Sequence, residues 1–167
     1  PRDALASKVR GTKLLDLAPG ARVGTGSTRR MALLRSLRPD LEIIPMRGNV
    51  PTRLGRLEGD ELDAVVLACA GLDRLGLSDS IDDRSSTGRM RPAVGQGLRA
   101  LETRAEDEWR ERIQSLENAG IAALARSERA YQCALGGDCS VPLAGFAERR
   151  TGGELRFRGL VSSLDGR

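Results

Sequence analysis

The sequence of 167 residues contains no histidine, and aromatic residues make up only 2% of it. The lack of histidine excludes Ser-His-Asp catalysis, Cys-His catalysis and metal sites that use histidine ligands. The scarcity of aromatic residues predicts a hydrophobic core built from Leu, Val, Ile and Ala. It also removes the stacking surfaces that proteins use to hold single-stranded nucleic acid. We therefore expect no nucleic-acid partner.

Cysteines are few, and no apolar run is long. The three cysteines, Cys69, Cys133 and Cys139, lack CxxC spacing, and their odd number argues against a disulfide framework. The longest apolar run, residues 64–72, is too short to span a bilayer, and no signal-peptide core follows the start. We expect a cytoplasmic protein without membrane contact. Because position 1 is proline rather than methionine, we also expect a piece of a longer protein.

Charge is the one compositional feature that points to a ligand. The chain has 27 Lys and Arg against 23 Asp and Glu, a formal net charge of +4. This excess favours acidic ligands, of which nucleic acid is only one class. The length fits one large domain or two small ones.

The first half alternates strand-like apolar runs with amphipathic helices. This βαβα order predicts an α/β fold with a mostly parallel sheet. The expected elements are a strand at 21–23, a helix at 27–37, a strand at 41–46, a short helix within 49–61, a buried strand within 62–70 and a helical turn within 71–77. The polar stretch 78–91 is interpreted as a loop or linker.

The second half has a different pattern. We expect a strand at 98–102, helices within 105–117 and 119–135, and two strands within 141–163 joined by a Gly-Gly turn. An α/β half therefore precedes a smaller α+β half, with the boundary near 116–120.

The stretch "VGTGSTRR" joins a predicted strand to a predicted helix. A glycine-rich turn in this place offers free backbone N–H groups and the positive end of a helix dipole. Thr25, Ser27 and Thr28 add hydroxyl groups, and Arg29 and Arg30 add charge. The stretch matches neither a P-loop nor GxGxxG. It is either a turn with a capping serine and solvated arginines, or a site for phosphate or carboxylate.

Further arginines follow predicted strands or turns, at Arg47, Arg53 and Arg74. Ligands of open α/β sheets bind beyond the carboxyl ends of the strands, so these arginines could converge there with Arg29 and Arg30. Such a cluster would suit a ligand with several carboxylates. For any single arginine, a solvated surface position remains the simpler interpretation.

Two loop residues are further candidates. Cys139 follows two glycines in "LGGDCSVP" and could act as a nucleophile or an attachment point. Cys69 and Cys133 are interpreted as small core residues. Gln96 lies between glycines in "PAVGQGL" and could reach a ligand, although a simple turn explains it equally well in isolation.

Seven stretches occur in an order and spacing that resemble the porphobilinogen deaminase (hydroxymethylbilane synthase) family. They are "PRDAL", "VGTGSTRR", "RPDLEIIPMRGNVPTRLGRL", "LDAVVLACAGLDRLGL", "PAVGQG", "SERA" and "LGGDCSVPLAGFAE". The resemblance implies a two-lobed α/β domain, like that of solute-binding proteins, with a parallel-rich mixed sheet and a small α+β domain after it. Residues 1–91 would be the second α/β domain, 92–116 the returning segment of the first, and 117–167 part of the C-terminal α+β domain.

The resemblance also implies an activity. Family members are transferases of tetrapyrrole (porphyrin and heme) biosynthesis that join four porphobilinogen units head to tail, with loss of ammonia. Their dipyrromethane cofactor is held by a thioether to the cysteine that matches Cys139. Residues that match the family's carboxylate-binding set are Thr25, Ser27, Thr28, Arg29, Arg30, Arg47, Arg53 and Arg74. Gln96 matches a glutamine near the domain hinge.

The chain departs from the family in extent. The family's catalytic aspartate belongs to a domain outside this chain, and Asp138 is interpreted as a polar loop residue only. We expect a fragment that is inactive alone, from a protein that is monomeric at full length. The exposed segment 92–116 would favour association of the fragment or disorder. A missing domain supplied by another chain, and a non-catalytic anion-binding α/β module, are the alternatives.

Overall fold

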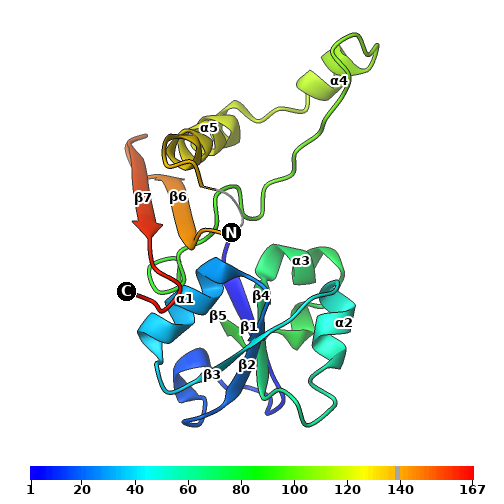
Figure 1. Ribbon diagram of the computed structural model, residues 1–167. Coiled ribbons are helices and arrows are strands. Elements are labelled where there is room, and N and C mark those ends of the chain that lie inside the picture. The colour runs from blue at the N-terminus through cyan, green and yellow to red at the C-terminus, as the bar shows by residue number, and fades with distance from the viewer. Residues whose placement is uncertain (138–139) are drawn as a thin grey trace.

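The computed structural model describes residues 1–137 and 140–167. It consists of a five-stranded sheet covered by helices on both faces, here called the sheet unit, and a helix packed on a two-stranded hairpin, the hairpin unit (Figure 1). This is the α/β arrangement followed by a small α+β part that the sequence predicts. Within the described residues, no helix has both the length and the hydropathy needed to cross a membrane.

The sheet unit is a mixed sheet in the order β3-β2-β4-β1-β5. Strand β2 pairs in parallel with β3 and β4, while β1 is antiparallel to β4 and β5. The strands are β1 (Asp3–Ser7), β2 (Arg22–Thr25), β3 (Glu42–Pro45), β4 (Ala64–Ala68) and β5 (Asp83–Arg84). The helices are η1 (Leu14–Asp16), α1 (Thr28–Leu37), α2 (Val50–Gly55), α3 (Cys69–Arg74) and η2 (Ser78–Ser80).

Two aliphatic clusters fix the helices to the sheet. Alternate residues of β4 point to opposite faces, so Val66 joins a cluster with Leu34 of α1, and Val65 joins another with Leu72 of α3. A strand that is apolar on both faces belongs in the middle of a covered sheet. As the composition predicts, no aromatic side chain is among the buried core residues of the described chain.

Strand β1 was not predicted, yet all of its residues are buried between β4 and β5. "DALAS" is short and begins with an acid, so its local pattern gives no strand signal. Its position depends on pairing with β4, where Asp3 lies opposite Ala68, far along the chain.

The interpretation of residues 78–91 as a linker is wrong. The stretch contains η2 and β5, and β5 forms an edge of the main sheet. Met90 is fully buried in the cluster beneath α1, and Ile81 packs on the cluster of the opposite face. Two apolar side chains and the pairing of β5 with β1 hold this polar stretch on the sheet.

The hairpin unit consists of α5 (Ala119–Ala134) packed on β6 (Leu143–Arg149) and β7 (Leu155–Val161). Tyr131 of the helix and Phe157 of the hairpin stack with ring centroids 5.0 Å apart. The predicted Gly-Gly turn between the strands is confirmed. Of the two cysteines expected in the core, Cys69 is buried, but Cys133 is exposed on α5. Its helix packs along one face only, and Cys133 lies off that face.

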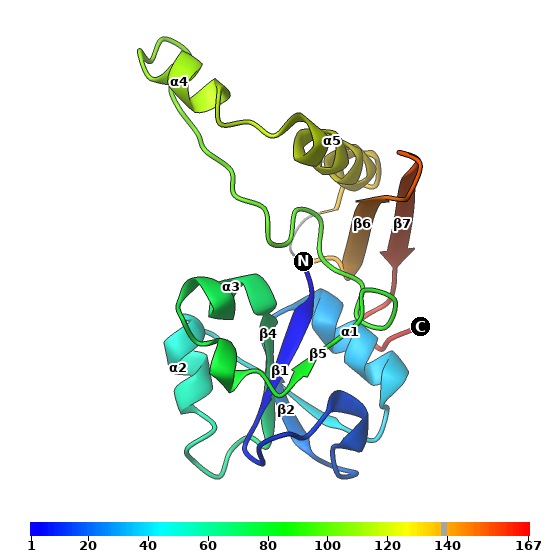
Figure 2. The same cartoon turned by 180° about the vertical axis from the view of Figure 1, so that it is seen from behind.

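Residues 98–118 extend away from both units, and both views place α4 (Arg110–Gln114) at the tip of this excursion (Figures 1 and 2). The strand predicted at 98–102 is absent, and the helix predicted within 105–117 is shorter than expected. A strand needs a neighbour to pair its N–H and C=O groups, and the described residues offer none here. Leu101, Trp109 and Leu116 are 62%, 52% and 70% exposed.

We expect Gly26→Ala to destabilise the sheet unit. A Cβ at position 26 would lie 2.3 Å from the backbone oxygen of Met46, which the pairing of β2 with β3 holds in place. The free energy of unfolding should fall by about 1–3 kcal/mol in urea titrations followed by circular dichroism. Gly55→Ala is the control, because no atom lies within 4 Å of its added Cβ. Equal stability of the two variants would contradict this close approach.

Candidate functional site

The candidate site lies at the edge of the main sheet where the parallel strands end. The carboxyl ends of β2, β3 and β4 share this edge, which is where open α/β sheets bind ligands. Because β1 runs antiparallel to β4, the first residue of β1 lies at this edge too. The topology therefore brings Asp3 to the same place as the turn that follows β2.

The turn after β2 caps helix α1. The hydroxyl of Ser27 accepts a hydrogen bond from the backbone N–H of Arg30 at 3.4 Å, and buried Thr25 accepts one from the N–H of Ser27 at 3.3 Å. The capping serine is thus present, but the arginines after it are not solvated. Arg29 and Arg30 are only 3% and 8% exposed.

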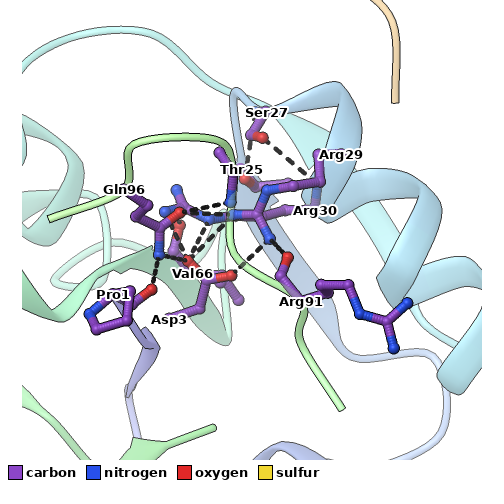
Figure 3. Close-up of polar contacts among 10 residues, drawn as sticks. Pro1, Asp3, Thr25, Ser27, Arg29, Arg30, Val66, Arg91 and Gln96 are labelled. Carbon is purple, nitrogen blue, oxygen red and sulfur yellow. Dashed lines mark hydrogen bonds and ion pairs between the residues drawn. The ribbon is translucent and has the colours of Figure 1, made fainter. Parts of the chain in front are cut away.

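Asp3 holds both arginines (Figure 3). Its Oδ2 lies 2.8 Å from Nη1 of Arg29, and its Oδ1 lies 2.8 Å from Nη2 of Arg30. Gln96 completes the group: its Nε2 donates to Oδ1 of Asp3 at 3.0 Å, and its Oε1 accepts from Nη2 of Arg29 at 3.0 Å. One carboxylate between two guanidinium groups leaves a net charge of +1 in this buried cluster.

Burial and charge act in opposite directions on the pKa of Asp3. Burial alone raises the pKa of this carboxyl, but the charges of Arg30 and Arg29 and their hydrogen bonds outweigh it, so the pKa is below its ordinary value of 3.8. Burial also lowers the pKa of Arg29, against the opposing effect of Asp3. The carboxyl of Asp3 is therefore ionised at neutral pH.

Each of the two guanidinium groups also donates to one backbone carbonyl. Arg30 donates from Nη1 to the carbonyl of Val66 at 3.3 Å, and Arg29 donates from Nη1 to the carbonyl of Arg91. The Nε of Arg29 is buried and has no hydrogen-bond partner among the described residues. This pair therefore supplies a fixed positive charge directly behind the turn.

The other predicted arginines are nearer to solvent. Arg47, two residues after β3, is exposed. Arg53 on α2 is half-buried and donates from Nε to the carbonyl of Gly48 at 2.8 Å. It lies beside the glycine turn: a Cβ added to Gly26 would be 3.7 Å from its Nη2. Arg74 at the end of α3 is exposed and donates to the carbonyl of Gly97 at 2.7 Å.

Of the remaining predicted residues, Thr28 is the first residue of α1, beside the turn. Cys139 lies outside the described residues, as does Asp138. The structure thus brings two buried arginines, the half-buried Arg53 and the hydroxyl of Ser27 to one glycine turn, while Arg47 follows β3 and Arg74 ends α3. Such a set suits an anion with several carboxylates.

Sequence reasoning missed Asp3. The stretch "PRDAL", which contains Asp3, is part of the family resemblance, but the sequence assigns no role to this aspartate. An acid near a short apolar run is common on protein surfaces. The available signal was the combination of two adjacent arginines in a glycine turn with no acid near them in the sequence. Buried arginines of this kind require an acidic partner from elsewhere in the fold.

We expect Asp3→Asn to cost about 3–5 kcal/mol of stability at pH 7, because it leaves two buried arginines without their counter-charge. Since the pKa of Asp3 is lowered in the folded chain, its contribution is present above pH 3.8 and is lost as the pH falls through the folded pKa. The variant should therefore show a weaker loss of stability below about pH 4 than the parent chain.

Urea titrations at pH 7 and pH 3 test this expectation. Asp60→Asn is the matched control, because Asp60 pairs with Lys8 at 2.7 Å with its side chain in solvent. Its stability should stay close to that of the parent chain, because an ion pair in solvent contributes little. An Asp3→Asn chain that unfolds at the same urea concentration as the parent would refute the role of this carboxylate.

The sequence matches two models of one protein family. Residues 1–112 match the family model described as "Porphobilinogen deaminase, dipyromethane cofactor binding domain", and residues 122–167 match "Porphobilinogen deaminase, C-terminal domain". The first match alone covers more than half of the chain.

Curated relatives agree along the whole chain. A porphobilinogen deaminase of Syntrophomonas wolfei is 44% identical over 168 aligned residues, which cover 100% of this chain and 54% of the relative. Those of Syntrophus aciditrophicus and a Roseiflexus species are each 45% identical over 100% of the chain, covering 54% and 55% of their own lengths. The chain spans about half the length of these relatives. It belongs to the porphobilinogen deaminase family.

Proposed function

We propose that this chain is the part of a hydroxymethylbilane synthase that binds the dipyrromethane cofactor and the growing pyrrole chain. The full protein would act in the cytoplasm as a monomer, joining porphobilinogen units with loss of ammonia. The observation that carries the proposal is the cationic sheet edge, which occurs within the residues that match the cofactor-binding domain. Of the three parts expected from the sequence, residues 1–91 contain most of this edge, and 92–116 add Gln96.

The donors at this edge fit the cofactor. A dipyrromethane with acetate and propionate side chains carries four carboxylates, which need several separate cations. Arg47, Arg53 and Arg74 supply cations toward solvent, while Arg29 and Arg30 supply charge from behind.

The residues of the chain bind and orient rather than transfer protons. The hydroxyl groups of Ser27 and Thr28 and the guanidinium groups around them would fix the carboxylates, and so fix where the reacting carbon lies. Thr25 is fully buried and would act indirectly, by holding the turn through the N–H of Ser27. When bound, the cofactor supplies the pyrrole carbon to which each new unit is joined. Attachment would form a bond from the Cys139 sulfur to an aminomethyl carbon as ammonia leaves with the thiol proton. No carboxylate of this chain takes the role of the family's catalytic aspartate, so we propose that the chain alone is inactive.

Intact-mass analysis tests attachment. We expect the chain, expressed in a host that supplies porphobilinogen and linear tetrapyrrole, to carry an adduct of two pyrrole units on the peptide that contains Cys139. Cys139→Ser should carry none. An unmodified Cys139 would instead support the alternative, an anion-binding α/β module without covalent chemistry.

Calorimetric titration with a synthetic dipyrromethane tetracarboxylate tests the cationic edge. We expect binding that weakens with salt, and a loss of affinity of about tenfold in Arg47→Ala and in Arg53→Ala, because each removes a charge-assisted hydrogen bond. Arg56→Ala is the control. Arg56 pairs at 2.7 Å with Glu61, which precedes β4 at the opposite edge of the sheet. A loss in Arg56→Ala as large as in the other two variants would count against a localised site.

A further inference from the structure

Glu128, in the "SERA" stretch of α5, is a buried carboxylate that the proposed function does not use. It is 6% exposed, and every other buried charged residue in the described chain belongs to the cluster around Asp3. Its Oε1 accepts a hydrogen bond from the N–H of Ala147 in β6 at 2.9 Å. Its Oε2 accepts one from the N–H of Gly95 at 2.7 Å. Glu128 therefore joins the hairpin unit to the loop 92–97.

The loop 92–97 is a turn with few hydrogen bonds of its own: the N–H groups of Gln96 and Leu98 donate to the carbonyls of Ala93 and Gly95 at 3.0 Å each. Gly95 and Gly97 have φ values of +71° and +85°, a region of the backbone that glycine enters freely. Gln96 stands between them. A loop with such freedom needs specific hydrogen bonds to hold a single conformation. The bond from Gly95 to Glu128 is of this kind, and it is short and charge-assisted.

The other end of this loop enters the cationic cluster. The side chain of Gln96 bridges Asp3 and Arg29, as described above, and also donates to the carbonyl of Pro1. The carbonyl of Gly97 accepts from Arg74. The residue that directly follows Gly95 thus reaches two members of the cluster.

We propose that Glu128 is a positioning residue that acts through Gly95 and Gln96 on the arginines of the sheet edge. The identity of the ligand, a polycarboxylate, rests on the proposed function. The effect of Glu128 on the position of Gly95 and Gln96 does not depend on that function. Glu128 belongs to the hairpin unit, so a residue outside the anion site would influence how the arginines of that site are positioned.

Glu128→Gln is the test variant, because it keeps the size of the side chain. In either orientation of the amide, one of the two N–H groups faces an NH2 group instead of an acceptor. Ala147 is held by its pairing with Phe157 on β7, so the loop should move instead. We expect hydrogen exchange of the Gly95 amide to become at least about tenfold faster, as befits the loss of one buried hydrogen bond. The NMR signals of the Gln96 side-chain amide should shift with it.

Glu117→Gln is the control. Glu117 precedes the same helix and pairs with Arg126 at 3.5 Å, with more than half of its side chain exposed. It should leave the signals of Gly95 and Gln96 unchanged. Should Glu128→Gln not fold, scalar coupling across the hydrogen bond from the Gly95 nitrogen to the Glu128 carboxylate carbon decides the matter in the parent chain. Absence of that coupling, or unchanged Gln96 signals in a folded variant, overturns the inference.

A double-mutant cycle separates positioning from simple stabilisation. With the dipyrromethane tetracarboxylate, Glu128→Gln should weaken binding by about fivefold in the parent chain and not further in Gln96→Ala, since both act through one contact. If the two substitutions each weaken binding independently, so that their effects on affinity multiply, Glu128 does not act through Gln96. A parent chain that does not bind the probe at all would refute the proposed function instead, and the Gln96 signals would still decide the role of Glu128.

Discussion

The sheet edge depends on one buried carboxylate held between two buried arginines. Asp3 begins β1, and Arg29 and Arg30 lie in the first turn of α1, so the ion pairs join an inner strand of the sheet to the helix that follows the glycine turn. Removing these charges from water is costly, and only mutual pairing and further hydrogen bonds offset that cost. Gln96 and two backbone carbonyls supply those bonds. The turn, the strand and the loop 92–97 therefore hold their positions together.

This pairing divides the arginines of the site into two kinds. Arg29 and Arg30 are fixed, and their excess of one positive charge acts on the turn from within a region of low dielectric constant, where it is weakly screened. Arg47 and Arg53 lie nearer to solvent, where a ligand can reach them. A fixed charge behind donors that face solvent suits a ligand with several carboxylates.

The loop 92–97 is also where the two units of the chain meet. Pro92 accepts a hydrogen bond from Gly145 of β6 at 3.1 Å, and Arg91 donates to the carbonyl of Gly159 in β7 at 3.1 Å. The same short loop thus contacts the hairpin and the cationic cluster. It is one of several contacts between the units, since Arg158 of β7 also donates to the hydroxyl of Thr87 at 3.2 Å and Leu160 packs on the core beneath α1.

Local patterns in the sequence determined the turn after β2, the helix it caps, the parallel strands and the arginines that follow them. Each of these depends on residues close together in the chain, through periodicity, capping and glycine. Only the tertiary structure decided that "DALAS" is a central strand, that 78–91 packs on the sheet, and that Asp3 neutralises part of the arginine charge. These features depend on pairing between distant segments, since a strand signal or an ion pair exists only once its partner is in place.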